Sequence, residues 1–516
     1  MSKIKTLLFL LLICPILLFS QSGYQPTSLD DITLSITTNL SGVVTEKIPS
    51  IAKVNDKIKV KGFFQSGGYV YALIETDGQL KKMSVKHTNR IDLDYENLQE
   101  FWLSQAVMNN TYDQLAFNPQ YDLRKELEEE ALNYRVQLNR NGLIFEDEYI
   151  ESYLYQLIYK LYPRVLNDGR TNLLNISIVK NASPNAYVFS NGSLYITTGL
   201  LSTINTEEEL LAILAHEIAH FVLDHSVVNI NKQVAREKRA SFWVGLSTLV
   251  AAGADIYMAT ENENYAPGTL TISTAIIASS IAESVMQRMG VAYSREQEFS
   301  ADECASELLK YLNYNPKSLG TALAKLKNYS ILNGNYSALY ASGSHPSLSA
   351  RIAALNGTTD DLINGDYDSN FSLINTFNAQ LEYQQFHFET CANLTRRNIK
   401  ASVATEDDYL LLAKCILRLY DTQEKNLLAL DYLKKASNLN VTPLIETNKQ
   451  ISIVYGRLNN KTEALLSLDL YINDIDIAYN EDYWKNYKYY LAEERSWAQK
   501  MKLKFQVTKI DLKSNN

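Results

Sequence analysis

The run from Leu210 to His220 constrains the fold most, because it contains no glycine or proline and carries two histidines four residues apart. On an α-helix, residues at this spacing lie on one face. Two imidazoles placed in this way can bind a single tetrahedral zinc ion, and Glu217 can reach a water on the open side of the metal. The run predicts a helix that presents His216, Glu217 and His220 to zinc; the alternative is a buried helix that carries these residues by chance.

A third ligand decides between these two interpretations. Helical composition returns at 294–305, where Glu298 and Asp302 share a face at i and i+4. Glu298 would complete a site of two histidines and one glutamate, and Asp302 could accept the other ring N–H of a ligand histidine. An exposed acidic helix face does not explain the small Ala301 beside them. His225 follows His220 by five residues, which favours a structural or supporting role over ligation.

In this order, H-E-x-x-H and E-x-x-A-D resemble the gluzincin metallopeptidases that include the CAAX prenyl proteases, the heat-shock protease HtpX and periplasmic relatives. Three further segments match that family, namely 183–187, 192–201 and the H-P-x-x-x-x-R-I element at 345–352. The resemblance covers roughly residues 140–356. It implies a zinc-dependent metalloendopeptidase with one zinc ion per chain.

The same resemblance implies roles for further residues. Glu217 would take a proton from the attacking water and return it to the leaving amine. His345 and Arg351 would lie near the cleft, where either could stabilise the oxyanion and His345 could instead cap the zinc. Asn185 and Ala186 would lie in an edge strand that binds substrate backbone. Without the resemblance, His345 with the following proline is as well explained by an ordinary turn.

The rest of the chain predicts an α+β fold that is mainly α. Alternating and aromatic strand patterns between Asp31 and Val85 indicate a small β module that resembles a bacterial SH3-like barrel. The expected organisation is a signal peptide at 1–22, the β module at 23–95, a charged helical connector at 96–139, the peptidase domain at 140–360 and tetratricopeptide-like helices at 361–516.

The tetratricopeptide-like assignment depends on a repeated spacing with a period of 35 residues. Tyr420, Ala429, Leu433 and Ala436 recur as Tyr455, Ala464, Leu468 and Tyr471. Small residues at such positions let paired helices pack closely. Two units are fewer than a stable stack needs, so flanking helices would have to contribute, and an irregular α-bundle is the alternative.

The first residues predict export. Lys3 and Lys5 precede the apolar run Thr6–Phe19, which is shorter than the roughly 20 residues of a spanning helix, so we expect a signal peptide and a periplasmic or secreted protein. An uncleaved anchor is the alternative. Two further apolar stretches, 240–259 and 270–282, lie where membrane members of the family have spanning helices; we expect packed helices, or a face resting on a membrane.

Composition narrows the partners. The net charge of −9 disfavours a nucleic-acid surface, so protein or peptide substrates are expected. The leading hypothesis is an endopeptidase that acts on exported or envelope proteins, with the helical repeats binding a protein partner. A chaperone or assembly scaffold with a largely silent protease site is the alternative, and a purely structural zinc protein is a weaker third.

Overall fold

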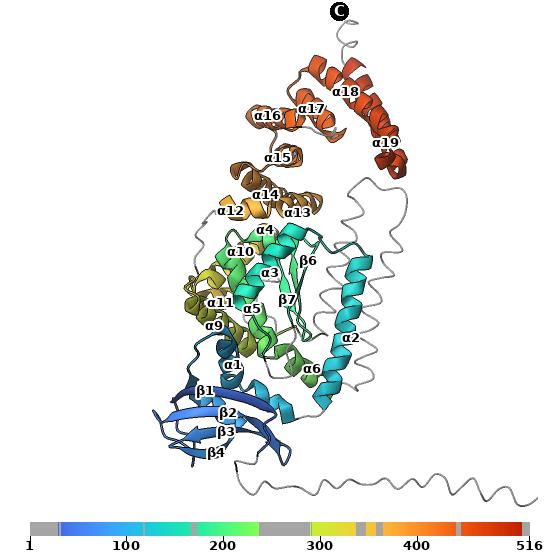
Figure 1. Ribbon diagram of the computed structural model, residues 1–516. Coiled ribbons are helices and arrows are strands. Elements are labelled where there is room, and N and C mark those ends of the chain that lie inside the picture. Colours follow the sequence, from blue (N-terminus) through green and yellow to red (C-terminus); the bar gives the residue numbers. More distant parts are fainter. Residues whose placement is uncertain are drawn as a thin grey trace, which may run out of the picture.

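The computed structural model describes residues 29, 32–116, 119–166, 173–236, 289, 291–336, 347–357, 365–439 and 445–507. Its parts follow one another along the molecule: an N-terminal sheet at one end, a mixed central part, and helices at the other end (Figure 1). This arrangement confirms the expected α+β, mainly α fold class.

The N-terminal sheet is antiparallel, with the strand order β4-β3-β2-β1-β5. Side chains of β1 alternate strictly between buried and exposed, which is the pattern of a strand with one face on a core. A two-residue turn with positive φ at Asp77 and Gly78 joins β3 to β4. The strands are β1 (Ile36–Val44), β2 (Lys57–Ser66), β3 (Tyr69–Thr76), β4 (Gln79–Ser84) and β5 (Ile91–Leu93).

The sheet shares its hydrophobic core with the central part of the molecule. One continuous apolar cluster runs from the buried face of the sheet through α1 (Leu98–Met108) into the central helices. Within it, the buried Trp102 donates its indole N–H to the backbone oxygen of Leu161 at 2.8 Å. The predicted boundary at residue 95 therefore does not separate two independent cores, and the SH3-like resemblance stays a prediction.

The charged segment at 124–130 lies in helix α2 (Pro119–Arg140), in the predicted connector. One stripe of this helix is buried: Leu127, Ala131, Tyr134 and Leu138 recur at helical spacing. The stripe packs in a second apolar cluster with aromatic side chains of the small sheet described next, and the hydroxyl oxygens of Tyr134 and Tyr187 lie 2.9 Å apart. Lys125, Glu128 and Glu129 are exposed on the outside of this helix, whereas Arg124 pairs with the buried Asp224.

The central part surrounds α5 (Glu207–Val222), which is buried from Glu209 to its end. It packs against α3, α9, α10 and strand β7. The small sheet has the order β6-β8-β7, so β7 is an edge strand, as expected. The other elements are α3 (Glu148–Leu161), β6 (Asn175–Val179), β7 (Ala186–Val188), β8 (Ser193–Thr197), α4 (Thr198–Thr203), α6 (His225–Arg236), α9 (Arg295–Tyr311), α10 (Ser318–Leu332) and α11 (Leu348–Ala354).

The C-terminal helices stack in chain order, each from α13 on packing against the next. The small and apolar residues of the repeated spacing, among them Ala429 on α16 and Ala464 on α18, are fully buried. The tetratricopeptide-like assignment stays a prediction. These helices are α12 (Gly365–Asn370), α13 (Ser372–Gln384), α14 (Phe388–Lys400), α15 (Glu406–Leu419), α16 (Gln423–Leu439), α17 (Ile445–Arg457), α18 (Lys461–Tyr479) and α19 (Lys488–Val507).

Several sequence predictions fall outside the described residues: the signal peptide, the apolar stretches 240–259 and 270–282, and His345. In the described part of the chain, no single helix has both the length and the apolar character to cross a membrane. Two consecutive helices, Glu207–Val222 and His225–Val234, are together long and apolar enough to cross a membrane, by length and composition only. The two helices meet at an angle of 48°.

Candidate metal centre

Local sequence fixes both ends of the histidine helix α5. Thr206 is its N-cap and accepts a hydrogen bond from the Glu209 N–H at 3.2 Å, and three glutamates occupy the first turn, where the helix dipole favours negative charge. No glycine or proline interrupts the helix. It ends at Val222, and Asp224 then adopts a positive φ of 64° before α6 begins.

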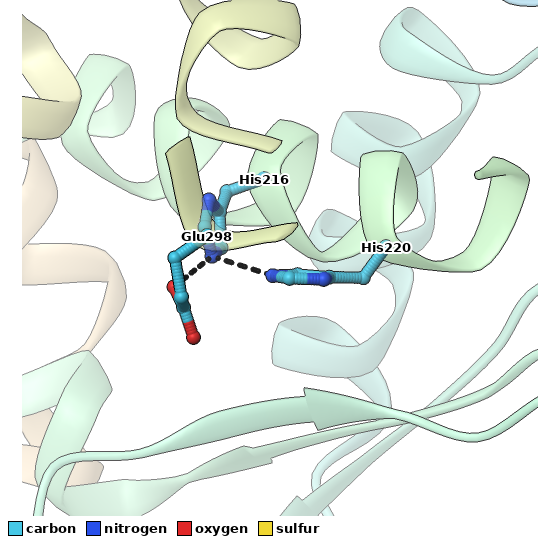
Figure 2. A group of neighbouring side chains, drawn as sticks. All are labelled: His216, His220 and Glu298. Atoms are coloured by element: carbon cyan, nitrogen blue, oxygen red, sulfur yellow. Dashed lines mark hydrogen bonds and ion pairs between the residues drawn. The ribbon is translucent and has the colours of Figure 1, made fainter. Parts of the chain in front are cut away.

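The structure brings the three predicted ligands together (Figure 2). Nε2 of His216 lies 3.1 Å from Nε2 of His220 and 3.5 Å from Oε2 of Glu298. One ligand atom from each residue lies within 4.8 Å of the others, and both histidines are buried. Glu298 reaches the cluster from the first turn of α9, which begins with a capping box formed by Ser294 and Gln297.

Each imidazole has a partner behind it. Nδ1 of His216 lies 3.0 Å from Oδ1 of Asp302, as expected for a carboxylate that supports a ligand histidine. Nδ1 of His220 lies 2.8 Å from Nδ1 of His225, so His225 supports a candidate ligand from outside the cluster. The ring of Tyr293 stacks on His220 with centroids 3.5 Å apart. Sequence reasoning missed Tyr293, and no motif signals its place.

Arg351 reaches the cluster from α11 and binds two carboxylates. Its Nε and Nη2 donate to the two oxygens of Asp302 at 2.9 and 2.6 Å, and its Nη1 lies 2.8 Å from Oε2 of Glu298. Such a forked contact fixes the orientation of a carboxylate. The structure therefore places Arg351 beside the predicted ligands, while its suggested contact with an oxyanion stays a prediction.

Burial and charge shift the pKa values of the cluster in opposite directions. Burial and Arg351 act to lower the pKa of His216, but its contacts with Asp302 and Glu298 outweigh them and raise it to about 9. Burial lowers the pKa of His220 far below its ordinary value. Burial acts to raise the pKa of Glu298, yet Arg351 and His216 together lower it. Glu298 is thus held as a carboxylate, the form that binds a metal.

Glu217 differs from Glu298 and Asp302, which form ion pairs with Arg351 and His216. Its side chain is buried, and its Oε2 has no hydrogen-bond partner within the described ranges. Burial raises the pKa of Glu217 to about 7. A buried oxygen without a partner requires an explanation, and a water held by a metal beside it would supply one. Two imidazoles, one carboxylate and this adjacent glutamate fit an open, catalytic zinc site.

The predicted substrate strand lies at the edge of the small sheet, beside α5. Asn185 donates its backbone N–H to Thr197 Oγ1 at 2.9 Å, and Ala186 pairs with Ile196 of β8. Among the described strands, β7 has a neighbour on one side only. This geometry suits the addition of an extended peptide, and the role of Asn185 and Ala186 stays a prediction.

Comparison with known proteins agrees with this geometry. Residues 152–359 match Peptidase family M48. The chain is 31% identical over 184 residues to a protein named Protease HtpX homolog from Campylobacter concisus, which covers 34% of this chain and 57% of that relative. It is 30% identical over 217 residues to a CAAX prenyl protease 1 homolog from Oryza sativa subsp. japonica, covering 40% and 46%.

The matched region contains every candidate residue of the metal centre and none of the N-terminal sheet or the helices from α12 on. The chain spans about 57% of the length of the first HtpX relatives that it matches. The similarity to Peptidase family M48 is thus carried by residues 152–359, the part of the chain that holds the candidate metal centre.

Proposed function

We propose that this protein is a zinc-dependent metalloendopeptidase that hydrolyses peptide bonds of exported or envelope proteins. The observation that carries the proposal is the convergence of His216, His220 and Glu298 beside a buried glutamate with an unpartnered oxygen. A structural zinc site is closed by four protein ligands, whereas a catalytic site has three and an open position. The M48 match over the same residues supports the catalytic interpretation.

The side chains divide the work of hydrolysis. Zinc held by the three ligands would supply Lewis-acid activation of a water and of the scissile carbonyl. Glu217 takes the proton of the attacking water and passes it to the leaving amine. Asp302 and His225 hold the ligand imidazoles in orientation, and Arg351 fixes Asp302 and Glu298. An extended substrate would pair with β7 at Asn185 and Ala186.

The site of action is part of the proposal. The basic residues Lys3 and Lys5 followed by the apolar run Thr6–Phe19 support export by a signal peptide, and hence substrates outside the cytoplasm. The helices from α12 on lie outside the M48 match and would recruit a protein partner. Contact with a membrane surface through 240–259 or 270–282 belongs to the same proposal.

The test compares zinc content and casein cleavage in the wild type and in Glu217→Gln. We expect one zinc ion per chain in both proteins and a loss of cleavage of about 10²- to 10⁴-fold in the variant, because the general base is removed while the ligands remain. Glu303→Gln is the matched control, since Glu303 is exposed on α9 and lies outside the cluster. It should cleave like the wild type.

Two results would contradict the proposal. A wild-type protein that binds no zinc would refute the metal centre, and full cleavage by Glu217→Gln would refute the role of the glutamate. A third result would favour a scaffold: a Glu217→Gln strain that keeps the biological role, while deletion of 365–516 abolishes it.

A further inference from the structure

A polar pocket lies among the C-terminal helices, and none of its lining residues belongs to the metal centre. It has a volume of about 400 Å³ and is lined by α13, α15, α17 and α19, the alternate members of the stack. Four of its lining side chains are cations and one is an anion: Lys414, Arg418, Lys449 and Arg457, with Glu446. The protein as a whole is acidic, with a net charge of −9, so this concentration of positive charge is local.

Ion pairs neutralise two of the four cations. Lys414 pairs with Glu446, and Lys449 lies 2.5 Å from a carboxylate oxygen of Glu494 on α19. Both lysines are largely buried, so these pairs belong to the packing between the helices. They stabilise the walls of the pocket and leave its charge to the two arginines.

The two arginines keep most of their charge available to the pocket. Arg418 donates to the hydroxyl oxygen of Tyr383 at 3.3 Å and makes no ion pair with the described carboxylates. Arg457 donates to the backbone oxygen of Tyr420, and its ion pair with Asp421 is long, at 3.7 Å, to a side chain that is 79% exposed. An exposed pair of this length contributes little.

The side chains that line the pocket favour carboxylates among the possible anionic ligands. Guanidinium groups bind carboxylates through two parallel hydrogen bonds, and arginine clusters recognise acidic motifs. Backbone nests are one way to capture a chain terminus. Apart from Glu446 in the first turn of α17, the lining residues of this pocket lie where their backbone N–H groups are used within the helices. Tyr383 and Trp497 add aromatic surface to the lining, and the ammonium groups of Lys414 and Lys449 lie 4.7 and 4.9 Å from their ring centroids.

We propose that this pocket, lined by Arg418 and Arg457, binds acidic side chains of a partner polypeptide. Aspartate or glutamate carboxylates of the partner bind the two guanidinium groups. This site gives the C-terminal helices a function of their own. It goes beyond peptide hydrolysis and is independent of the metal centre.

The test uses the full-length chain with Glu217→Gln, so that the probe peptides are not cleaved. A short fluorescein-labelled peptide of alanine and glutamate, amidated at its C-terminus, is titrated and followed by fluorescence anisotropy. Its matched probe replaces every glutamate by glutamine, and a third probe is the glutamine peptide with a free C-terminal carboxylate. Inorganic phosphate serves as a competitor.

We expect the glutamate peptide to bind and the amidated glutamine peptide not to bind. Arg418→Gln and Arg457→Gln should each weaken binding by about tenfold or more, since a charge-assisted hydrogen bond is lost in each. Arg495→Gln is the matched control. Arg495 lies on α19, outside the pocket lining, in an exposed ion pair with Asp476 of α18. Its replacement removes the same charge, and the variant should bind the peptide within about twofold of the parent.

Three outcomes would overturn the proposal. Equal binding of the glutamate and amidated glutamine peptides would show that carboxylates are not recognised. Equal weakening by Arg495→Gln and by the pocket variants would show a general charge effect. Binding of the free-carboxylate glutamine peptide as tight as that of the glutamate peptide, or displacement by millimolar phosphate, would identify a chain terminus or a phosphate group as the ligand.

Discussion

The metal centre and the junction between the peptidase domain and the C-terminal helices both bury charged groups, but they pair them differently. Near the junction, Lys325 on α10 lies 2.7 Å from Glu209 on α5, inside the peptidase domain, and Arg397 on α14 lies 2.5 Å from Asp368 on α12, inside the C-terminal helices. Arg397 also donates to backbone oxygens of the α4 region, including that of Ile204 at 3.0 Å. At the metal centre, Glu217 is buried with an oxygen that has no described partner.

This difference separates structural charge from catalytic charge. A buried charge that is paired holds two elements together, and removing one partner leaves the other unsatisfied. A buried carboxylate with an oxygen that has no partner is held at a cost in stability, and groups with strongly shifted pKa values concentrate at functional sites. The predictions below test whether the two clusters respond in these two ways.

Breaking the Lys325–Glu209 pair, which joins α10 to α5 inside the peptidase domain near the junction, should have the largest effect on stability. Lys325→Met leaves Glu209 buried without its cation, so we expect a loss of about 3–5 kcal/mol in the free energy of unfolding. Urea denaturation measures it. The double variant Lys325→Met with Glu209→Gln should recover part of the loss. Lys435→Met, which breaks an exposed pair with Asp431, should cost less than about 1 kcal/mol; equal losses would erase the distinction.

At the metal centre, replacing a buried charged residue should raise stability instead of lowering it. In protein stripped of metal by a chelator, burial raises the pKa of Glu217 from 4.5 in the unfolded chain to about 7 in the folded one. The folded state then favours the protonated form, so stability falls as pH rises from about 4.5 to about 7. Glu217→Gln removes this penalty and should be more stable than the wild type by up to about 3 kcal/mol at pH 8.

Chemical denaturation of both stripped proteins at pH 4 and at pH 8 measures this effect. The two proteins should differ little at pH 4, where the carboxyl is protonated in both states. The Glu303→Gln control changes an exposed side chain and should give no gain at either pH. A Glu217→Gln variant that is less stable at pH 8 would show that the glutamate is structural.

The sequence predicted features that are local along the chain. The four-residue spacing of His216 and His220 and that of Glu298 and Asp302 report a shared helix face directly, so the candidate ligands could be named. The alternation in β1 likewise predicted a strand with one buried face. Helix α2 was predicted from composition, but its buried stripe at Leu127 and Tyr134 depends on a partner surface far away in the sequence.

Contacts between distant segments could not be predicted in this way. The fork of Arg351 on Asp302 joins residues 49 positions apart, and the pair of Lys325 with Glu209 joins residues 116 positions apart. Nothing in either local pattern identifies the partner, because the packing of α10 against α5 and α9, and of α11 against α10, sets these distances. The same reason hid the core shared by the N-terminal sheet and the central helices.

Asp302 should show the smallest effect of the three sites, because it is both a paired buried charge and a member of the metal centre. It is paired with Arg351, as Glu209 is with Lys325, and it also lies 3.0 Å from Nδ1 of the candidate ligand His216. Asp302→Asn keeps the shape and removes the charge, so we expect zinc affinity to fall by about 10- to 100-fold in competition with a chromophoric chelator. Unchanged affinity would assign Asp302 to structural pairing alone. If Asp302→Asn lost as much stability as Lys325→Met and kept its zinc affinity, Asp302 would be a structural ion-pair partner only.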